Sequence, residues 1–214
     1  EQFDNKDIYQ CIINDKNIKL YTINSELIYA DDLDKKINAD LFIFISRHSA
    51  KEERKCLTAH VPGNFGKNEL GGKEKTLCIA PAVYLKDIIE ELNKNAEGSD
   101  YEISIEATHH GPFLEKPVLF VEIGSSEKEW IDETAGNIIA KSLINVFNKN
   151  NEKSNNNDYE SVFVIGGGHY NHVANKVMLE TNLAVGHICA KYNLENLNYE
   201  LIKEAMEKTV PKAR

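Results

Sequence analysis

The chain has 214 residues, of which 42% are hydrophobic and 28% charged, a composition typical of one ordinary globular domain with a sizeable core. It contains no apolar run near the ~20 residues that a transmembrane helix needs and no signal-peptide pattern at its start, so we expect no membrane partner. The formal net charge of −9 argues against extensive nucleic-acid binding, and we expect no DNA partner, although a local basic patch is compatible with this charge.

In the first half of the chain, apolar runs predict strands and one periodic segment predicts a helix. The strand candidates are residues 41–46, 56–61, 76–80 and 101–107. Before the fourth of these, apolar residues from Leu85 to Ala96 recur at helical spacing, which predicts a helix that begins near Pro81 and ends at Gly98. Residues 63–75 predict a loop whose glycines let a ligand approach the backbone and whose lysines supply positive charge.

Strands and helices also interleave in the second half. The strand candidates are residues 117–123, 161–165 and 184–190, and the helix candidates are Ser126 to about Val146, Asn171 to Glu180, and residues 198–210. The polar segment at about 148–160 predicts a disordered surface insert. This order of elements predicts a single α/β domain over residues 1–214, built as a three-layer α/β/α sandwich with a mixed, mostly parallel sheet.

The cysteine pattern bears on the compartment and on the type of metal site. Cys11, Cys56, Cys78 and Cys189 are far apart and form no CxxC pair, and three of them lie in apolar, strand-like surroundings. We therefore expect buried, reduced thiols in a cytoplasmic protein and no cysteine-based zinc site.

Most of the histidines stand at the ends of predicted strands. His48 follows the first strand candidate, His60 ends the second, the adjacent pair His109 and His110 follows the fourth, and His169 follows the sixth. Ligands bind at the carboxyl edge of open α/β sheets. The pattern therefore predicts a common polar site at one edge of the sheet.

Three further features bear on this site. Glu122 is a carboxylate at the end of an apolar strand, where it must be paired, protonated or metal-bound. His187 lies inside the seventh strand candidate, and its position leaves open whether it is a core histidine or a member of the site. Residues 166–168 are three glycines directly before His169, and their amides suit either an anion cradle or a tight turn.

Imidazoles with a carboxylate suit two kinds of chemistry. Neutral imidazoles and a carboxylate are zinc ligands, and zinc with an open position activates a water molecule. Without a metal, a histidine acts as general base and Glu122 orients it. A serine nucleophile is less favoured because the chain has no GxSxG motif; the candidates would be Ser46, Ser49, Ser125 and Ser126.

Six motifs together resemble the archaeal and plant type of D-aminoacyl-tRNA deacylase. They are SRHSA, LTAHVPGNFG, EATHHGP, VEIGSSEKEW, GGGHY and AVGHICAKY, spread over residues 46–192. The resemblance implies a phosphorylase/hydrolase-like fold, similar to that of peptidyl-tRNA hydrolases. It implies hydrolysis of the ester between a D-amino acid, such as D-tyrosine, and the 3′-terminal ribose of tRNA, with two zinc ions per subunit. It also implies further segments before Glu1 and after Arg214.

The motifs and the strand-end pattern together give the expected site residues. We expect the catalytic residues to be His109, His110, Glu122 and His169. We expect substrate contacts from Arg47, His48, His60, Asn64, Lys67, Gly166, Gly167 and Gly168. We look for the metal ligands among His48, His60, His110, His169 and His187.

The expected partner is D-aminoacyl-tRNA, bound by a monomeric enzyme. An acidic protein that binds tRNA needs a local basic rim, which we expect from Arg47, Lys51, Arg54, Lys55, Lys67, Lys73 and Lys75. Two alternatives stay open at this point. One is another hydrolase or a phosphorylase of the same fold, and the other is a non-catalytic protein that binds tRNA or metal.

Overall fold

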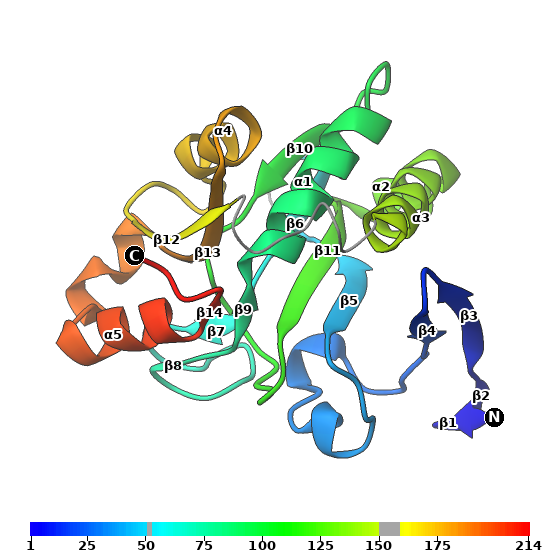
Figure 1. Ribbon diagram of the computed structural model, residues 1–214, viewed down its shortest axis with the longest axis horizontal. Coiled ribbons are helices and arrows are strands. Elements are labelled where there is room, and N and C mark those ends of the chain that lie inside the picture. Colours follow the sequence, from blue (N-terminus) through cyan, green and yellow to red (C-terminus); the bar gives the residue numbers. More distant parts are fainter. Residues whose placement is uncertain (51–52, 150–158) are drawn as a thin grey trace.

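A four-stranded mixed sheet forms the centre of the protein (Figure 1). The structure is a computed structural model that describes residues 1–50, 53–149 and 159–214. In spatial order the strands are β10 (Glu102–Ile105), β6 (Cys56–His60), β11 (Val118–Gly124) and β5 (Phe42–Arg47). β10 runs parallel to β6 and β5 runs parallel to β11, but β6 and β11 are antiparallel, so the sheet consists of two parallel pairs of opposite direction.

Two helices, α1 (Ala82–Asn95) and α3 (Glu133–Asn148), pack side by side and cover one face of this sheet (Figure 1). Their inward sides are apolar because apolar residues recur at helical spacing: Leu85, Ile88 and Leu92 of α1 are fully buried. Leu57 and Ala59 of β6 are fully buried too, and as alternate residues they share one face of the strand. The opposite face of the sheet is the polar one.

A second parallel pair, β12 (Glu160–Ile165) and β13 (Leu183–Cys189), lies beside the end of β10. The amide of Ala107 donates a hydrogen bond to the carbonyl of His169, and the amide of Thr108 donates to the carbonyl of Ile188. α4 (His172–Glu180) connects β12 to β13. These contacts bring the residues that follow β12 next to those that follow β10.

The remaining elements lie around this centre. α5 (Tyr199–Glu207) packs against β12 and β13, and β14 (Thr209–Val210) pairs in parallel with β9 (Ala80–Pro81). Three antiparallel pairs are formed by β1 (Gln2–Phe3) with β2 (Lys6–Asp7), β3 (Tyr9–Ile13) with β4 (Lys16–Leu20), and β7 (Gly63–Asn64) with β8 (Thr76–Leu77). The short helices are α2 (Glu127–Trp130) and the 3₁₀ turns Leu27–Tyr29, Leu33–Lys35 and Lys191–Asn196.

The α/β class and the mixed sheet are confirmed, and the arrangement in three layers stays a prediction. The single helix expected from Ser126 to about Val146 is wrong: α2 ends at Trp130, and the Asp132 side chain begins α3 by accepting a hydrogen bond from the amide of Thr134 at 2.8 Å. The N-terminal strand pairs were not predicted. Of the expected polar insert, residues 150–158 lie outside the described residues.

The four cysteines are free thiols, with Cys11 exposed and Cys56, Cys78 and Cys189 buried. Burial raises the pKa of the Cys56 thiol to about 12, so this group is protonated at neutral pH. In the part of the chain that the structure describes, no helix has both the length and the hydrophobicity needed to cross a membrane.

Candidate active site

The register of the central sheet sets polar side chains side by side on its uncovered face. Ser46 of β5 pairs with Glu122 of β11, Glu122 pairs with Thr58 of β6, and Thr58 pairs with Ser104 of β10. Glu122, Thr58 and Ser104 are buried, and the Ser46 hydroxyl donates a hydrogen bond to Glu122 Oε1. A row of buried polar side chains is costly in a core, so this row indicates a functional site.

The next row on this face contains His60, which pairs with Phe120, and Glu106, which follows the end of β10. The site therefore lies on a face of the sheet, and the expected position at one carboxyl edge is wrong. Because β5 is parallel and β6 antiparallel to β11, β5, which precedes His48, and β6, which ends at His60, run in opposite directions. The segments that follow the strands fold back over the face and complete the site.

Glu106 is the centre of the site and is only 1% exposed. Its Oε2 lies 2.9 Å from Nε2 of His169 and 3.6 Å from Nε2 of His109, and its Oε1 lies 3.4 Å from Nδ1 of His48. Burial raises the pKa of Glu106, but the hydrogen bond with His169 and the electrostatic effect of the surrounding imidazoles lower it further than burial raises it. The carboxyl group is therefore held ionised inside a ring of histidines.

His60, His109 and His110 form one side of this ring. His60 is fully buried, its ring stacks on Phe120 at a centroid distance of 5.3 Å, and its Nε2 lies 3.2 Å from Nε2 of His110. Removal from water lowers the pKa of all three imidazoles, to about 3 for His109 and well below the ordinary value for His60. These imidazoles are neutral at pH 7, the form that binds a metal or accepts a proton.

The consecutive histidines reach the same place because the chain turns at the second of them. His110 has a φ of 44°, in the left-handed region that side chains rarely adopt. Nδ1 of His109 donates to the carbonyl of Ala107 at 2.8 Å, and Nδ1 of His110 donates to that of Gly111 at 2.5 Å. A carbonyl only accepts, so each Nδ1 carries the proton and each Nε2 keeps its lone pair for the site.

His48 forms the other side of the ring. Its Nδ1 lies 3.4 Å from Glu106 and 3.4 Å from Glu122, and the hydroxyl of Tyr170 donates to its Nε2 at 2.5 Å. Its carbonyl accepts a hydrogen bond from the indole of Trp130 at 2.8 Å, which fixes the backbone. Burial lowers the pKa of His48, but the hydrogen bond with Glu122 and the two carboxylate charges outweigh burial and raise it.

The donor atoms around Glu106 fit a metal ion. Within the described residues there are three sets of donors, and inside each set the donor atoms lie within 4.8 Å of one another. The sets are His60, His109 and His110; His48, Glu106 and His169; and His60, Glu106 and Glu122. Nδ1 of His60 and both oxygens of Glu106 are buried without a hydrogen bond of good geometry from any described residue. A cation would satisfy such donors, and imidazoles with carboxylates are a set that zinc accepts.

The three glycines after β12 directly precede His169, which places them next to the histidine ring. Gly167 has a φ of 83°, and a Cβ there would lie 2.4 Å from the side-chain nitrogen of Asn171, so only glycine fits. The amide of Gly166 donates to the carbonyl of Cys189. The amides of Gly167 and Gly168 donate no hydrogen bond to any described residue. Two amides without a protein acceptor, next to His169, suit an anionic oxygen.

The structure brings together six of the expected residues, His48, His60, His109, His110, Glu122 and His169. His187 is not among them. It is fully buried, with Nδ1 3.2 Å from the Thr108 hydroxyl, and its Nε2 donates to the carbonyl of Cys78 at 3.0 Å. Because both ring nitrogens have partners in the core, His187 is placed as a core histidine.

Other expected contact residues have structural partners of their own. Asn64 donates from Nδ2 to the carbonyls of Gly71 and Lys73, and so closes the loop at 63–75. The guanidinium of Arg47 lies 4.9 Å from the centre of the Trp130 ring. Lys67 is exposed on the loop. Of the expected basic rim, Lys51 lies outside the described residues.

The sequence reasoning missed Glu106 and Tyr170. In YEISIEA the residues Glu102, Ser104 and Glu106 alternate with apolar ones, a pattern that indicates a solvated face. Only Glu102 is exposed, because the segment around Tyr170 folds over the end of the strand, where Tyr170 forms an antiparallel bridge with Glu106. The only available signal was that Tyr170 directly follows the GGGH sequence.

Comparisons with known proteins agree on one family. Residues 35–214 match the family model described as D-aminoacyl-tRNA deacylase. A D-aminoacyl-tRNA deacylase from Thermococcus onnurineus is 40% identical over 200 residues, which is 90% of this chain and 71% of that protein. One from Thermococcus kodakarensis is 38% identical over 214 residues, 97% of this chain and 75% of that protein.

The fold has a solved relative as well. The crystal structure of AF0625, described as a conserved protein of unknown function, superimposes with a TM-score of 0.83 at 31% sequence identity. The likeness covers 95% of this chain and 75% of that one. The sheet that carries the histidine ring is therefore shared with a protein of known structure.

Proposed function

Because the chain belongs to the D-aminoacyl-tRNA deacylase family, it hydrolyses the ester between a D-amino acid and tRNA, and we propose that the ring of histidines around Glu106 carries out this reaction. The observation that supports this assignment is the buried carboxylate within 3.6 Å of three imidazoles. Buried, perturbed groups of this kind are typical of catalytic sites.

The ester of an aminoacyl-tRNA is already activated, so a positioned water and a stabilised oxyanion are sufficient for hydrolysis. His109 is the proposed general base, because it is neutral and its Nε2 lone pair faces the site. Its Nδ1 proton is fixed on the carbonyl of Ala107, and Glu106, 3.6 Å from Nε2, stabilises the imidazolium that forms when the water proton is taken up.

The developing negative charge on the ester oxygen needs donors that are in place before the reaction. The free amides of Gly167 and Gly168 are the proposed donors. Their position is fixed by Asn171, whose side chain donates to the carbonyl of Gly166 at 3.0 Å. Pre-organised amides of this kind stabilise an oxyanion without any rearrangement during the reaction.

Zinc is the proposed cofactor, and two neighbouring donor sets that share no residue support two ions. His60, His109 and His110 would hold one, and His48, Glu106 and His169 would hold the other. When bound, zinc would lower the pKa of a water molecule and polarise the ester carbonyl. A metal held by His109 would take over the lone pair assigned to the base, and Glu122, which faces the same ring, is then the residue left to accept the proton.

The reaction is tested with matched D-tyrosyl-tRNA and L-tyrosyl-tRNA. We expect release of D-tyrosine only, and we expect His109→Gln to lower the rate at least a hundredfold while His187→Gln keeps it. The two variants make the same His→Gln change, one at a histidine of the site and one at a histidine of the core, so a difference in rate reflects the position of the histidine. Release of neither amino acid by the unaltered chain would contradict the catalytic assignment and leave a protein that binds tRNA without turnover.

A further inference from the structure

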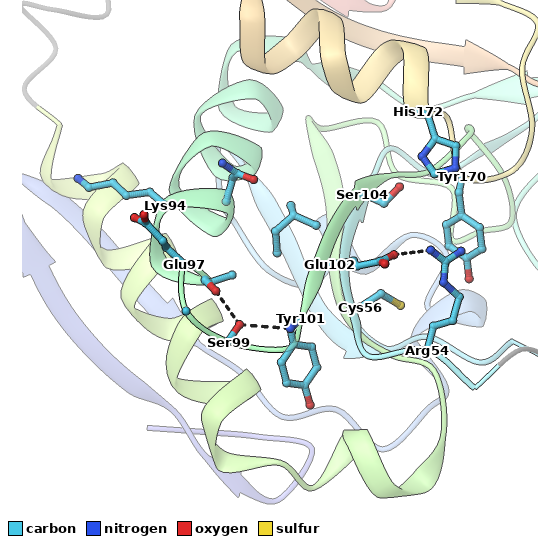
Figure 2. Close-up of a pocket in the computed structure, with 14 residues that line it drawn as sticks. Arg54, Cys56, Lys94, Glu97, Ser99, Tyr101, Glu102, Ser104, Tyr170 and His172 are labelled. Carbon is cyan, nitrogen blue, oxygen red and sulfur yellow. Dashed lines mark hydrogen bonds and ion pairs between the residues drawn. The ribbon is translucent and has the colours of Figure 1, made fainter.

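A groove with a volume of about 810 Å³ runs across the outer edge of β10, next to the histidine ring. Figure 2 shows that its lining falls into two parts, with Lys94 and Glu97 on one side of the strand and Arg54, Tyr170 and His172 gathered on the other. Glu102, Ser104 and Cys56 complete this second part, which we call the near half of the groove.

The near half of the groove adjoins the proposed catalytic site. Ser104 lines the groove, and Glu106, two residues further along, is the centre of the ring; as alternate residues they point to the same face. Two residues of strand span only about 6.6 Å. Tyr170 belongs to both places, since it lines the groove and its hydroxyl donates to His48.

The lining of the near half has the chemistry of a nucleotide site. Arg54 supplies a guanidinium, which Glu102 holds by an ion pair and which lies 5.7 Å from the centre of the Tyr170 ring. His172 is exposed, and its imidazole makes no hydrogen bond or ion pair with any described residue. Aromatic and imidazole faces stack on bases, hydroxyls bind ribose and a guanidinium binds phosphate.

The side chain of the D-amino acid is a poorer occupant. Pockets for apolar or aromatic groups are lined mainly by apolar side chains. Here Arg54, Glu102, Ser104 and His172 are polar, and Cys56 is buried. A polar wall of this kind fits the part of the substrate that is itself polar and is the same in every molecule, the end of the tRNA.

We propose that the near half of the groove binds the 3′-terminal nucleotide of the tRNA, so that its 3′ ester passes Tyr170 and reaches the ring around Glu106. This inference rests on the proposed function, because it names the part of the same substrate that the neighbouring surface holds. The phosphate lies at Arg54, the base stacks between Tyr170 and His172, and the ribose lies along Ser104.

The test is binding of the trinucleotide 5′-CCA-3′, labelled with a fluorophore at its 5′ end, to the full chain by fluorescence anisotropy. We expect His172→Ala to weaken binding about tenfold, the effect of losing one base stack. Ser104→Ala tests the ribose contact with a smaller change of side chain. Lys176→Ala is the matched control, because Lys176 lies one turn further along α4 and pairs with Glu180 outside the groove.

The same variants are then assayed with D-tyrosyl-tRNA and D-alanyl-tRNA. We expect a raised KM for both substrates by the same factor and an unchanged kcat. Equal CCA affinity for the unaltered chain, His172→Ala and Ser104→Ala would overturn the proposal, as would a KM effect on only one of the two amino acids, which would place the amino acid in the groove. Failure of the unaltered chain to release D-amino acid, with CCA binding intact, would contradict the proposed function and leave the nucleotide site standing.

Discussion

The hydroxyl of Tyr170 donates to Nε2 of His48 at 2.5 Å and joins the segment after β12 to the segment after β5. Burial raises the pKa of this phenol to about 12, so it keeps its proton at neutral pH and can donate it to the imidazole. The hydrogen bond orients the imidazole so that Nδ1 faces Glu106 and Glu122, each 3.4 Å away.

Tyr170→Phe removes this hydroxyl and keeps the ring. We expect kcat to fall about tenfold because one hydrogen bond to the imidazole is lost, with KM changed less than twofold. The measurement is steady-state deacylation of D-tyrosyl-tRNA. Tyr192→Phe, which removes a hydroxyl 3.2 Å from Nδ1 of His169 on the outer side of the ring, is a comparison variant of the same chemistry. A rise in KM at constant kcat would show that Tyr170 only contacts substrate.

Glu106→Gln tests the centre of the ring. The amide has the shape of the carboxylate but no charge to hold the imidazoles, so we expect kcat to fall at least a hundredfold. The free energy of unfolding is expected to stay within about 1 kcal/mol of that of the unaltered chain, since the change also removes the desolvation cost of a buried charge. Rate and thermal unfolding are measured together. Glu160→Gln, on a half-exposed residue of β12, is expected to change neither; loss of folding in Glu106→Gln would make the carboxylate a structural group instead.

Zinc content tests the proposed cofactor directly. We expect protein purified without chelator to contain zinc by atomic absorption, and His60→Gln to lose at least half of it. His187→Gln is the control, because both nitrogens of His187 are bound within the core. We expect a zinc chelator to abolish turnover and added zinc to restore it. Full turnover with less than one-tenth of a zinc ion per chain would rule out a catalytic metal.

His187 makes the fold sensitive to acid. Burial lowers the pKa of its imidazole to about 3 in the folded chain, against about 6.5 when unfolded. The unfolded chain therefore takes up this proton first, and stability is lost as the pH falls below 6.5 towards 3. One such group lowers the free energy of unfolding by about 2 kcal/mol between pH 7.5 and pH 5. Urea unfolding at both values is expected to show that His187→Gln loses less stability over this range than the unaltered chain; an identical loss would contradict the shift.

Gly111 lies in close contact with two other segments of the chain, those around Gly72 and Ile28. A Cβ at this position would lie 2.3 Å from the amide nitrogen of Gly72 and 2.4 Å from the carbonyl oxygen of Ile28. We expect Gly111→Ala to destabilise the fold by about 2 kcal/mol through this overpacking and to lower activity by displacing His110. Gly136→Ala in α3 meets no atom within 4 Å and is expected to stabilise the helix. Thermal unfolding distinguishes them; equal melting temperatures would show that the loop yields at no cost.

Local patterns in the sequence were enough to place most of the elements. The apolar spacing between Leu85 and Ala96 predicted α1, and uninterrupted apolar runs predicted β11 and β12. These patterns could be read from the sequence because they depend only on neighbours within a few residues. The break between α2 and α3 was not visible, because Ile131 and Asp132 do not interrupt the apolar periodicity.

The site was predictable in its composition but not in its place. The histidine-rich strand ends indicated a cluster, and five of its histidines and Glu122 do meet. The direction of β6 relative to β11 depends on long-range pairing, which no local pattern encodes. Glu106 was not predicted as a site residue for the same reason, since its burial is due to residues more than sixty positions later that cover β10.

The antiparallel placement of β6 inside the sheet has one further consequence. The donors of the ring lie on strands, or on segments directly after strands, that pair only after distant parts of the chain have met. A shift of β6 by a single residue would turn His60 and Thr58 away and present Leu57 and Ala59 instead. Such long-range pairing forms late in folding. A chain that is still folding, or has folded in the wrong register, therefore has no esterase activity with which to attack correctly charged tRNA.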